Sequence, residues 1–186
     1  MCTLTWQANE KGYRVLFTRD EQRRRPQAIL PTIEQKLAAV YPIDPQGQGT
    51  WIACNKLGHT WCLLNLYSLA QDNPSKLKDT GSRQVSRGQI ILAALAQFAS
   101  TMLPTEYEIT VWLHALCVDE KFSPFTLCFF PNYKLTEKFQ PKYWQWDGQN
   151  LLSAQLGNMF TSSGKLFAAV KQNREQVFAQ LGQLNS

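Results

Sequence analysis

Residues that bind metal ions or build disulfide scaffolds are few in this sequence. It has two histidines, His59 and His114, and neither belongs to an HExxH or CxxCH motif. Cysteine occurs five times without a CxxC pair, at Cys2, Cys54, Cys62, Cys117 and Cys128. The sequence therefore predicts neither a zinc site nor a disulfide framework, and we expect no resident cofactor.

Long apolar segments are missing as well. The run Ile90–Ala96 and its neighbours fall short of the roughly 18 residues that suggest a membrane span. No signal or transit segment is visible, so we expect a cytoplasmic protein without a membrane span. With 186 residues, 44% of them hydrophobic, the chain is long enough for one domain over residues 1–186 with a substantial core.

The net charge of +5 raises the question of a nucleic-acid partner. The arginines that could provide one cluster in a single short segment, at Arg19, Arg23, Arg24 and Arg25. Asp20 and Glu21 interrupt the cluster, and no aromatic side chains are interleaved with it to stack on bases. We therefore expect a solvated turn or a site for an anionic small molecule, and no nucleic-acid partner.

The first residues predict a β-hairpin. Cys2–Gln7 and Tyr13–Thr18 are rich in apolar and branched side chains, and the loop between them contains Asn9 and Gly12. Antiparallel pairing brings the end of the second strand beside the start of the first. Arg19 and Asp20 should therefore lie near Cys2.

Four prolines divide the next segment, at Pro26, Pro31, Pro42 and Pro45. We expect a crossing segment there, with only a short helix over Thr32–Val40. A second hairpin should follow, with strands over Thr50–Cys54 and Thr60–Asn65. Its second strand ends at Asn65.

The second half of the chain mixes helical and strand patterns. A polar stretch over residues 70–85 indicates a surface loop. Helical spacing then predicts a helix from Ser86 to about Met102, with Ser86 as its N-cap. Further strands are predicted over Tyr107–Leu116, Phe125–Phe130 and Tyr143–Trp146, and a last helix over Lys165–Leu184. The turn pair Asp147-Gly148 closes the last of these strands and is followed by Leu151–Leu152. Helices packed on antiparallel hairpins indicate an α+β fold.

Cysteine at position 2 is the candidate nucleophile. If Met1 is removed, the Cys2 thiol and its own α-amine become the first groups of the chain. A thiol with an ordinary pKa of about 8.5 beside an α-amine of about 7.7–8.0 supplies nucleophile and base in one residue. The alternative is a small, buried apolar side chain, since Cys2–Trp6 is typical of an ordinary strand.

The order of several short motifs resembles the NRDE family, also called the transport and Golgi organisation family. Its members begin Met-Cys, carry Asn-Arg-Asp-Glu after the second strand, and continue with Gly-Gly-Thr-Trp and a strand ending in Leu-Asn. Here the matching pieces are Cys2, Thr18–Glu21, Gln48–Trp51, Leu64–Asn65, Ser86–Gly88, Trp144–Gly148 and Thr161–Ser163. Thr18 replaces the first Asn of the family motif, and Gln48 replaces its first Gly.

This resemblance implies a branch of the N-terminal-nucleophile (Ntn) hydrolases, whose fold is an αββα sandwich of antiparallel sheets with flanking helices. It implies that Cys2 attacks a small amide, as a hydrolase or acyl transferase. Arg19 would favour the thiolate, and Asp20 would orient the α-ammonium. Asn65 would donate its side-chain amide to the oxyanion, with Asn55, which also ends a strand of the same hairpin, as the second candidate for that role.

Other interpretations of the same residues stay open. The resemblance also implies a non-catalytic carrier of haem or a lipid-like ligand, with Cys2 ligating iron or lining an apolar pocket. The alternative for Arg19 and Asp20 is a surface ion pair. Ser86–Gly88 could bind a phosphate or carboxylate instead of only capping a helix, and Thr161–Ser163 is predicted to cap the last helix.

Overall fold

Two antiparallel sheets and three helices make up the part of the chain that the computed structural model describes, residues 2–21, 23–67, 85–132, 134, 139–153, 159–163 and 167–183. The smaller sheet has the strand order β10-β1-β2 and consists of β1 (Cys2–Asn9), β2 (Gly12–Arg19) and β10 (Met159–Ser162). The larger sheet keeps the chain order from β3 to β9. Its strands are β3 (Ile29–Glu34), β4 (Ala39–Ile43), β5 (Ile52–Asn55), β6 (Thr60–Asn65), β7 (Phe125–Phe130), β8 (Lys142–Trp146) and β9 (Leu151–Ser153).

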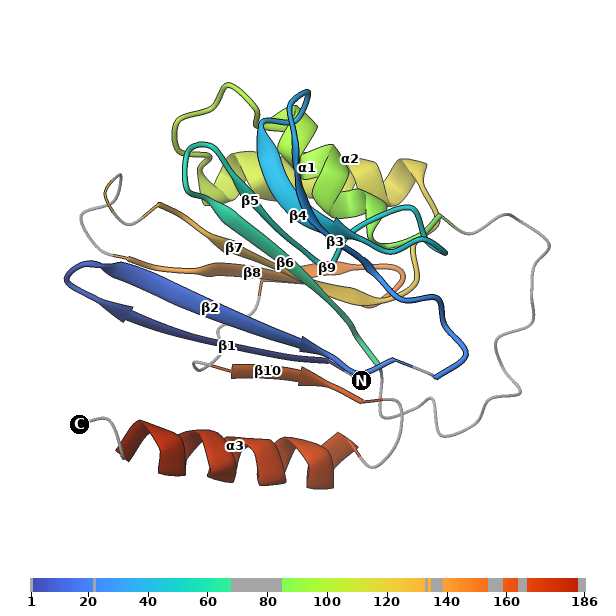
Figure 1. Cartoon of the computed structure of the whole chain (residues 1–186). Coiled ribbons are helices and arrows are strands. Elements are labelled where there is room, and N and C mark those ends of the chain that lie inside the picture. The colour runs from blue at the N-terminus through green and yellow to red at the C-terminus, as the bar shows by residue number, and fades with distance from the viewer. Residues whose placement is uncertain are drawn as a thin grey trace.

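The elements stack in four layers. Helices α1 (Gln89–Gln97) and α2 (Glu106–Asp119) cover the outer face of the seven-stranded sheet, and α3 (Phe167–Gln183) lies along the outer face of the three-stranded sheet (Figure 1). The two sheets face each other between these helices (Figure 1). The predicted α+β fold of antiparallel sheets with flanking helices is confirmed.

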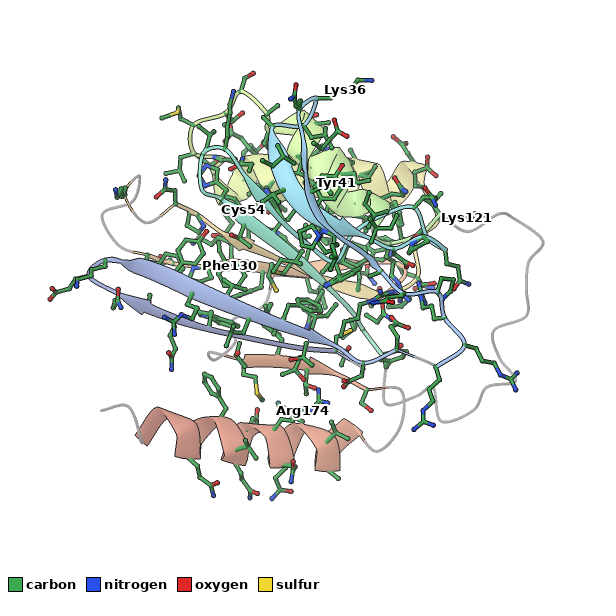
Figure 2. The ribbon with its side chains drawn as sticks, viewed as in Figure 1. Lys36, Tyr41, Cys54, Lys121, Phe130 and Arg174 are labelled. Carbon is green, nitrogen blue, oxygen red and sulfur yellow. The ribbon has the colours of Figure 1, made fainter. Side chains whose placement is uncertain are left out.

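Strand periodicity divides the apolar side chains between two cores. On β6, Trp61 and Leu63 point towards the helices, whereas Cys62 and Leu64 point towards the smaller sheet. Every residue of β7 is buried, because helices cover one of its faces and the smaller sheet covers the other. Phe130 lies between the sheets (Figure 2), with its ring 5.4 Å from that of Trp6.

The predicted helix over residues 32–40 is wrong, since this segment contains the end of β3, a turn and the start of β4. Thr32 pairs with Tyr41, and Ile33 pairs with Val40. Branched and aromatic side chains favour this pairing over a helix. Pro31 fits because β3 is an edge strand, where a missing N–H group can face solvent.

The predicted strand over residues 107–116 is also wrong, because these residues lie in α2. Thr105 begins the helix with a capping box: its hydroxyl accepts from Glu108 N (3.2 Å), and the Glu108 carboxylate accepts from Thr105 N (2.8 Å). The buried side chains recur at every fourth position, at Ile109, Leu113 and Cys117. Tyr107 and Val111 suggested alternation, but both are exposed.

Several boundaries differ from the prediction. Helix α1 has Gly88, not Ser86, as its N-cap, without a side-chain capping bond, and it ends at Gln97 before reaching Met102. Thr161 and Ser162 belong to β10 and pair with β1 instead of capping α3. The predicted loop over residues 70–84 falls outside the described residues. Among the helices described, none is long and apolar enough to cross a membrane.

Candidate active site around Cys2

Cys2 is the first residue of the central strand of the smaller sheet. It pairs with Arg19 on β2 and with Ser162 on β10, so these three side chains share one face of the sheet. That face looks towards the larger sheet, and Cys2 is only 9% exposed. The expected placement of Arg19 beside Cys2 is confirmed.

A small cavity of about 110 Å³ opens beside Cys2. Five segments that are distant in the sequence meet around it: the start of β1, the end of β2 with the residues after it, the β4–β5 loop, the end of β6, and the residues before α1. Its polar and charged lining residues include Cys2, Arg19, Glu21, Arg25, Asp44, Asn65 and Arg87.

Two glycines allow the last of these segments to approach the cavity. A Cβ on Gly49 would lie 2.4 Å from the carbonyl carbon of Gly88, and a Cβ on Gly88 would lie 2.9 Å from Thr50 N. Thr50 N instead donates to Gly88 O (3.2 Å). The backbones therefore touch, and this contact positions Arg87, the residue just before Gly88, at the cavity wall.

A network of ion pairs holds two of the arginines. Arg19 Nη2 donates to Asp44 Oδ2 (3.2 Å), and Arg19 Nε lies 2.9 Å from Glu21 Oε1. Arg25 also pairs with Asp44, and it lies 3.5 Å from Glu21. The Arg19 guanidinium stands 4.2 Å from the ring centre of Trp51, which adds a cation–π contact.

Asp44 was not recognised from the sequence. Burial by itself would raise the pKa of its carboxyl, but the Arg25 and Arg19 guanidinium groups hold that pKa below its ordinary value. Its backbone N also donates to Gly49 O (2.8 Å), which closes the loop before Thr50. The turn signal Asp44-Pro45, a few residues before Gly49-Thr50, was the only indication in the sequence.

Arg87 differs from the other two arginines. Arg87 Nη1 donates to the carbonyl of Pro124 (2.9 Å), and in the described part of the chain no carboxylate pairs with Arg87. Burial lowers the pKa of its guanidinium, while the Tyr67 and Cys2 side chains act in the opposite direction. A charged group is thus partly desolvated at the cavity wall.

The two asparagine candidates lie in different places. Asn65 lines the cavity at the end of β6, and its Nδ2 donates to Tyr67 Oη (3.0 Å). Asn55 is the last residue of β5, and its Oδ1 accepts from Leu57 N (3.1 Å) and His59 N (3.0 Å) in the turn that follows. Only Asn65 therefore shares the cavity with Cys2.

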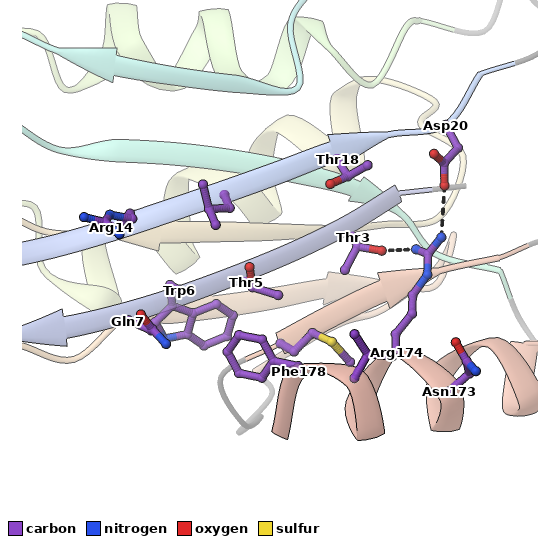
Figure 3. Close-up of a pocket in the computed structure, with 13 residues that line it drawn as sticks. Thr3, Thr5, Trp6, Gln7, Arg14, Thr18, Asp20, Asn173, Arg174 and Phe178 are labelled. Atoms are coloured by element: carbon purple, nitrogen blue, oxygen red, sulfur yellow. Dashed lines mark hydrogen bonds and ion pairs between the residues drawn. The ribbon is translucent and has the colours of Figure 1, made fainter. Parts of the chain in front are cut away.

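Asp20 points to the opposite face of the smaller sheet, because neighbouring residues of a strand alternate. Figure 3 shows its carboxylate paired with Arg174 of α3, at 3.0 Å from Nη2. Arg174 Nη1 also donates to Thr3 Oγ1, to Thr161 Oγ1 (3.1 Å) and to the Cys2 carbonyl (3.4 Å). Asp20 is thus connected to the start of β1 through Arg174.

The thiol of Cys2 favours its neutral form in this structure. Burial raises the pKa of this thiol above its ordinary value, and the Glu21 carboxylate raises it further. The α-amine of Met1 and the Arg19 guanidinium lower it. The nearby Ser162 hydroxyl also lowers the pKa of the thiol. Ser162 is only 3% exposed, and apart from the thiol its hydroxyl has no hydrogen-bond partner among the groups described. Ser162 was predicted as a helix cap and not as a neighbour of the thiol.

A second and larger hollow lies on the other face of the smaller sheet. This groove, which we call the α3 groove, has a volume of about 580 Å³ and runs between β1, β2 and α3 (Figure 3). Its lining includes Thr3, Thr5, Leu16, Met159, Val177 and Phe178. Cys2 is not part of this lining, so the groove and the cavity are separate sites.

The fold and cavity define a protein of antiparallel sheets between helices, with a cysteine at the start of a central strand. The sequence profile of the family Transport and Golgi organisation 2 (TANGO2) matches residues 1–177, and the chain belongs to this family. The family resemblance of the motifs is thereby confirmed. No curated protein matches the chain.

Proposed function

We propose that this protein is a cysteine amide hydrolase or acyl transferase of the N-terminal-nucleophile type, acting on a small amide. The observation that carries the proposal is the meeting of Cys2, Arg19 and Asn65 at one cavity. Each is brought there by a strand end, which gives the side chains fixed positions. The proposal requires that Met1 is removed, because only then does Cys2 carry a free α-amine.

In the first half of the reaction, Cys2 Sγ attacks the amide carbonyl carbon and a C–S bond forms. The thiol proton passes to the α-amine of Cys2. The carbonyl oxygen becomes an oxyanion. When the oxyanion collapses, the C–N bond breaks and the leaving amine takes the proton from the α-ammonium.

In the second half, water or an acceptor amine attacks the thioester carbonyl. The attacking group gives a proton to the α-amine, the C–S bond breaks, and that proton returns to sulfur. The products are a carboxylic acid in hydrolysis, or a new amide in acyl transfer, and the free Cys2 thiol.

The neighbouring residues support these steps. One hydrogen of the Asn65 amide is used by Tyr67, which leaves the second for the oxyanion. Arg19 lies beside Cys2 and offers positive charge to the developing thiolate. Asp20, held by Arg174 at the start of β1, would orient the α-ammonium.

The first test is the intact mass of protein purified from its native host. Loss of the mass of Met1 supports the proposal, and its retention would remove the base and contradict it.

The second test uses p-nitrophenyl acetate, whose acetyl group is transferred to a nucleophilic thiol with release of coloured p-nitrophenolate. We expect a burst that Cys2→Ala abolishes and that Cys54→Ala, a change at a cysteine outside the cavity, retains. A burst that survives Cys2→Ala would sink the mechanism.

The α3 groove favours a second candidate function, the non-catalytic carrying of haem or a lipid-like ligand. Its volume lies in the range of small-molecule sites, whereas the Cys2 cavity is far too small for such a ligand. On this proposal the groove, and not iron ligation by Cys2, holds the ligand. Val177 is half exposed on the groove wall, so Val177→Asp should spoil the groove without affecting the core.

Haem titration followed by its Soret band, and titration with a fluorescent fatty acid, test this candidate. Binding that is lost in Val177→Asp and retained in Cys2→Ala would support it. The absence of binding of both ligands at micromolar concentration would contradict it.

A further inference from the structure

Among the residues described, the side chains around the Cys2 cavity carry more positive than negative charge. Three arginines line it, Arg19, Arg25 and Arg87, against two carboxylates, Asp44 and Glu21. Both carboxylates are shared between Arg19 and Arg25. Among the described residues, Arg87 is therefore left without an acidic partner.

The position of Arg87 is fixed rather than adaptable. Pro124 O accepts one of its hydrogen bonds, and the Gly49–Gly88 contact holds the backbone next to it. The remaining donors of a guanidinium form a planar fork that matches a carboxylate. Burial disfavours the charge of Arg87, and a bound anion would offset that cost.

The adjoining helix strengthens the preference for an anion. Arg87 precedes Gly88, the N-cap of α1, and the helix runs for nine residues from Gln89. The N-terminal end of a helix carries partial positive charge. Both the side chain and the helix end thus present positive potential to the same cavity.

The size of the cavity limits what enters it. A volume of about 110 Å³ has room for only a few small groups. This space accommodates a reacting carbonyl and one short charged group. The rest of a larger substrate must extend beyond the cavity.

We propose that Arg87 binds a carboxylate of the substrate, so that the substrate class is a small amide that carries a carboxylate close to the scissile carbonyl. This inference rests on the proposed function for the reacting carbonyl, but the anion site itself can be tested separately. Arg87 is assigned a role in substrate binding and selectivity, while Cys2 and Asn65 perform the chemistry.

The first experiment compares alkylation of Cys2 by iodoacetate, an anion, and by neutral iodoacetamide. In both reactions Sγ displaces iodide and forms a C–S bond, so the two reagents differ mainly in the charge of the group beside the reacting carbon. We expect the iodoacetate-to-iodoacetamide rate ratio at Cys2 to fall about tenfold in Arg87→Gln, since one charge-assisted hydrogen-bonded contact is lost. Arg87→Lys, which keeps the charge, should restore part of the ratio.

Peptide mapping resolves the sites of alkylation. Cys54 is partly exposed and lies outside the cavity, so it serves as the internal control, and its ratio should not change. A ratio at Cys2 that is the same in the unmodified protein and in Arg87→Gln would overturn the inference while leaving the nucleophile in place. Far-UV circular dichroism checks that each variant is folded.

The second experiment measures the anion site without the thiol. Trifluoroacetate is titrated into Cys2→Ala and followed by fluorine NMR, with and without Arg87→Gln. Saturable binding that weakens about tenfold without Arg87 supports the anion site even if Cys2 reacts with neither reagent, an outcome that would count against the proposed chemistry alone. Binding that is unchanged by Arg87→Gln, or no binding at all, would contradict the inference.

Discussion

Each end of the β5–β6 hairpin carries an asparagine, but the two asparagines differ in how they are hydrogen-bonded and in what surrounds them. At the turn end, Asn55 accepts two backbone hydrogen bonds and His59 is almost fully buried. At the open end, Asn65 lines a cavity that it shares with Cys2 and Arg87. The first end stabilises the hairpin, and the second leaves hydrogen-bonding capacity for another molecule.

The bonds of His59 show how completely the turn end is paired. Its Nδ1 accepts from Asn132 N (2.9 Å), and its Nε2 lies 2.8 Å from Met102 O, to which it donates in the neutral ring. Asn132 in turn donates to Leu57 O (2.7 Å). These bonds tie three separate segments together, as expected of a structural cluster.

The cavity end contains groups that the protein itself leaves underused. In the described residues, Ser162 Oγ has no hydrogen-bond partner besides the Cys2 thiol, and Arg87 has no carboxylate partner. Because buried polar groups are normally paired, such groups mark a place where a ligand can complete the bonding. The difference between the two ends thus separates a structural polar cluster from a candidate site.

The largest effect on this comparison is expected when each asparagine is replaced by alanine in a separate variant. Asn65→Ala should slow acetylation of Cys2 by p-nitrophenyl acetate by roughly 100-fold or more, because an oxyanion donor is lost. Asn55→Ala should leave this rate unchanged but lower the free energy of unfolding by about 1–3 kcal/mol, because two N–H groups lose their acceptor. Burst kinetics and urea unfolding measure the two quantities. The opposite pattern would show that the roles of the two ends are assigned the wrong way round.

Gly49→Ala tests whether the backbone contact builds the cavity end. Its Cβ would lie 2.4 Å from the Gly88 carbonyl carbon, so the two segments must separate, at a cost of about 1–3 kcal/mol in unfolding free energy. Because this separation moves Arg87, the iodoacetate-to-iodoacetamide rate ratio at Cys2 should also fall. Gly148→Ala is the control, since it introduces strain at a φ of +105° but lies outside the cavity lining. Unchanged stability and selectivity in Gly49→Ala would refute this explanation.

The turn end should respond to pH through His59. Burial holds the pKa of His59 in the folded protein below the ordinary value of about 6.5. Below that value the unfolded chain binds a proton that the folded protein resists, so unfolding free energy is retained above pH 6.5 and lost as the pH falls. Urea unfolding midpoints measured between pH 7.5 and 5.5 report this loss of stability. In His59→Leu the midpoint should no longer depend on pH in this range. His114→Gln, a change at an exposed histidine, should keep the pH dependence. A pH dependence that persists in His59→Leu would show that another group causes it.

The smallest effect is expected at Ser162. Ser162→Ala removes a hydroxyl that lowers the pKa of the Cys2 thiol, so that pKa should rise and iodoacetamide should react a few-fold more slowly at pH 8. Stability should change little, because the buried hydroxyl has no hydrogen-bond partner to lose other than the thiol. The pH dependence of alkylation measures the pKa. Thr5→Ala, on the opposite face of the sheet, serves as the control, and equal pKa values in both variants would count against the role of Ser162.

Local pattern predicted a large part of the fold. Alternating side chains and turn residues identified both hairpins and the buried strand β7, and the register of the first hairpin brought Arg19 beside Cys2. The same alternation failed at α2, where Tyr107 and Val111 are apolar yet exposed. The spacing of apolar residues predicts a helix or a strand correctly only when these residues are also the buried ones. Burial depends on packing partners elsewhere in the chain.

By itself, then, the sequence determined the elements whose bonds are local and the placement of Cys2 and Arg19 across one hairpin. Only the tertiary structure decided that Asp44 and Arg87 join them, and that Asn65 rather than Asn55 lies at the cavity. The physical reason is the distance along the sequence between the residues that interact. A hairpin register follows from neighbouring residues, whereas the cavity depends on contacts such as Gly49 against Gly88, between segments that only the packing of sheets and helices brings together.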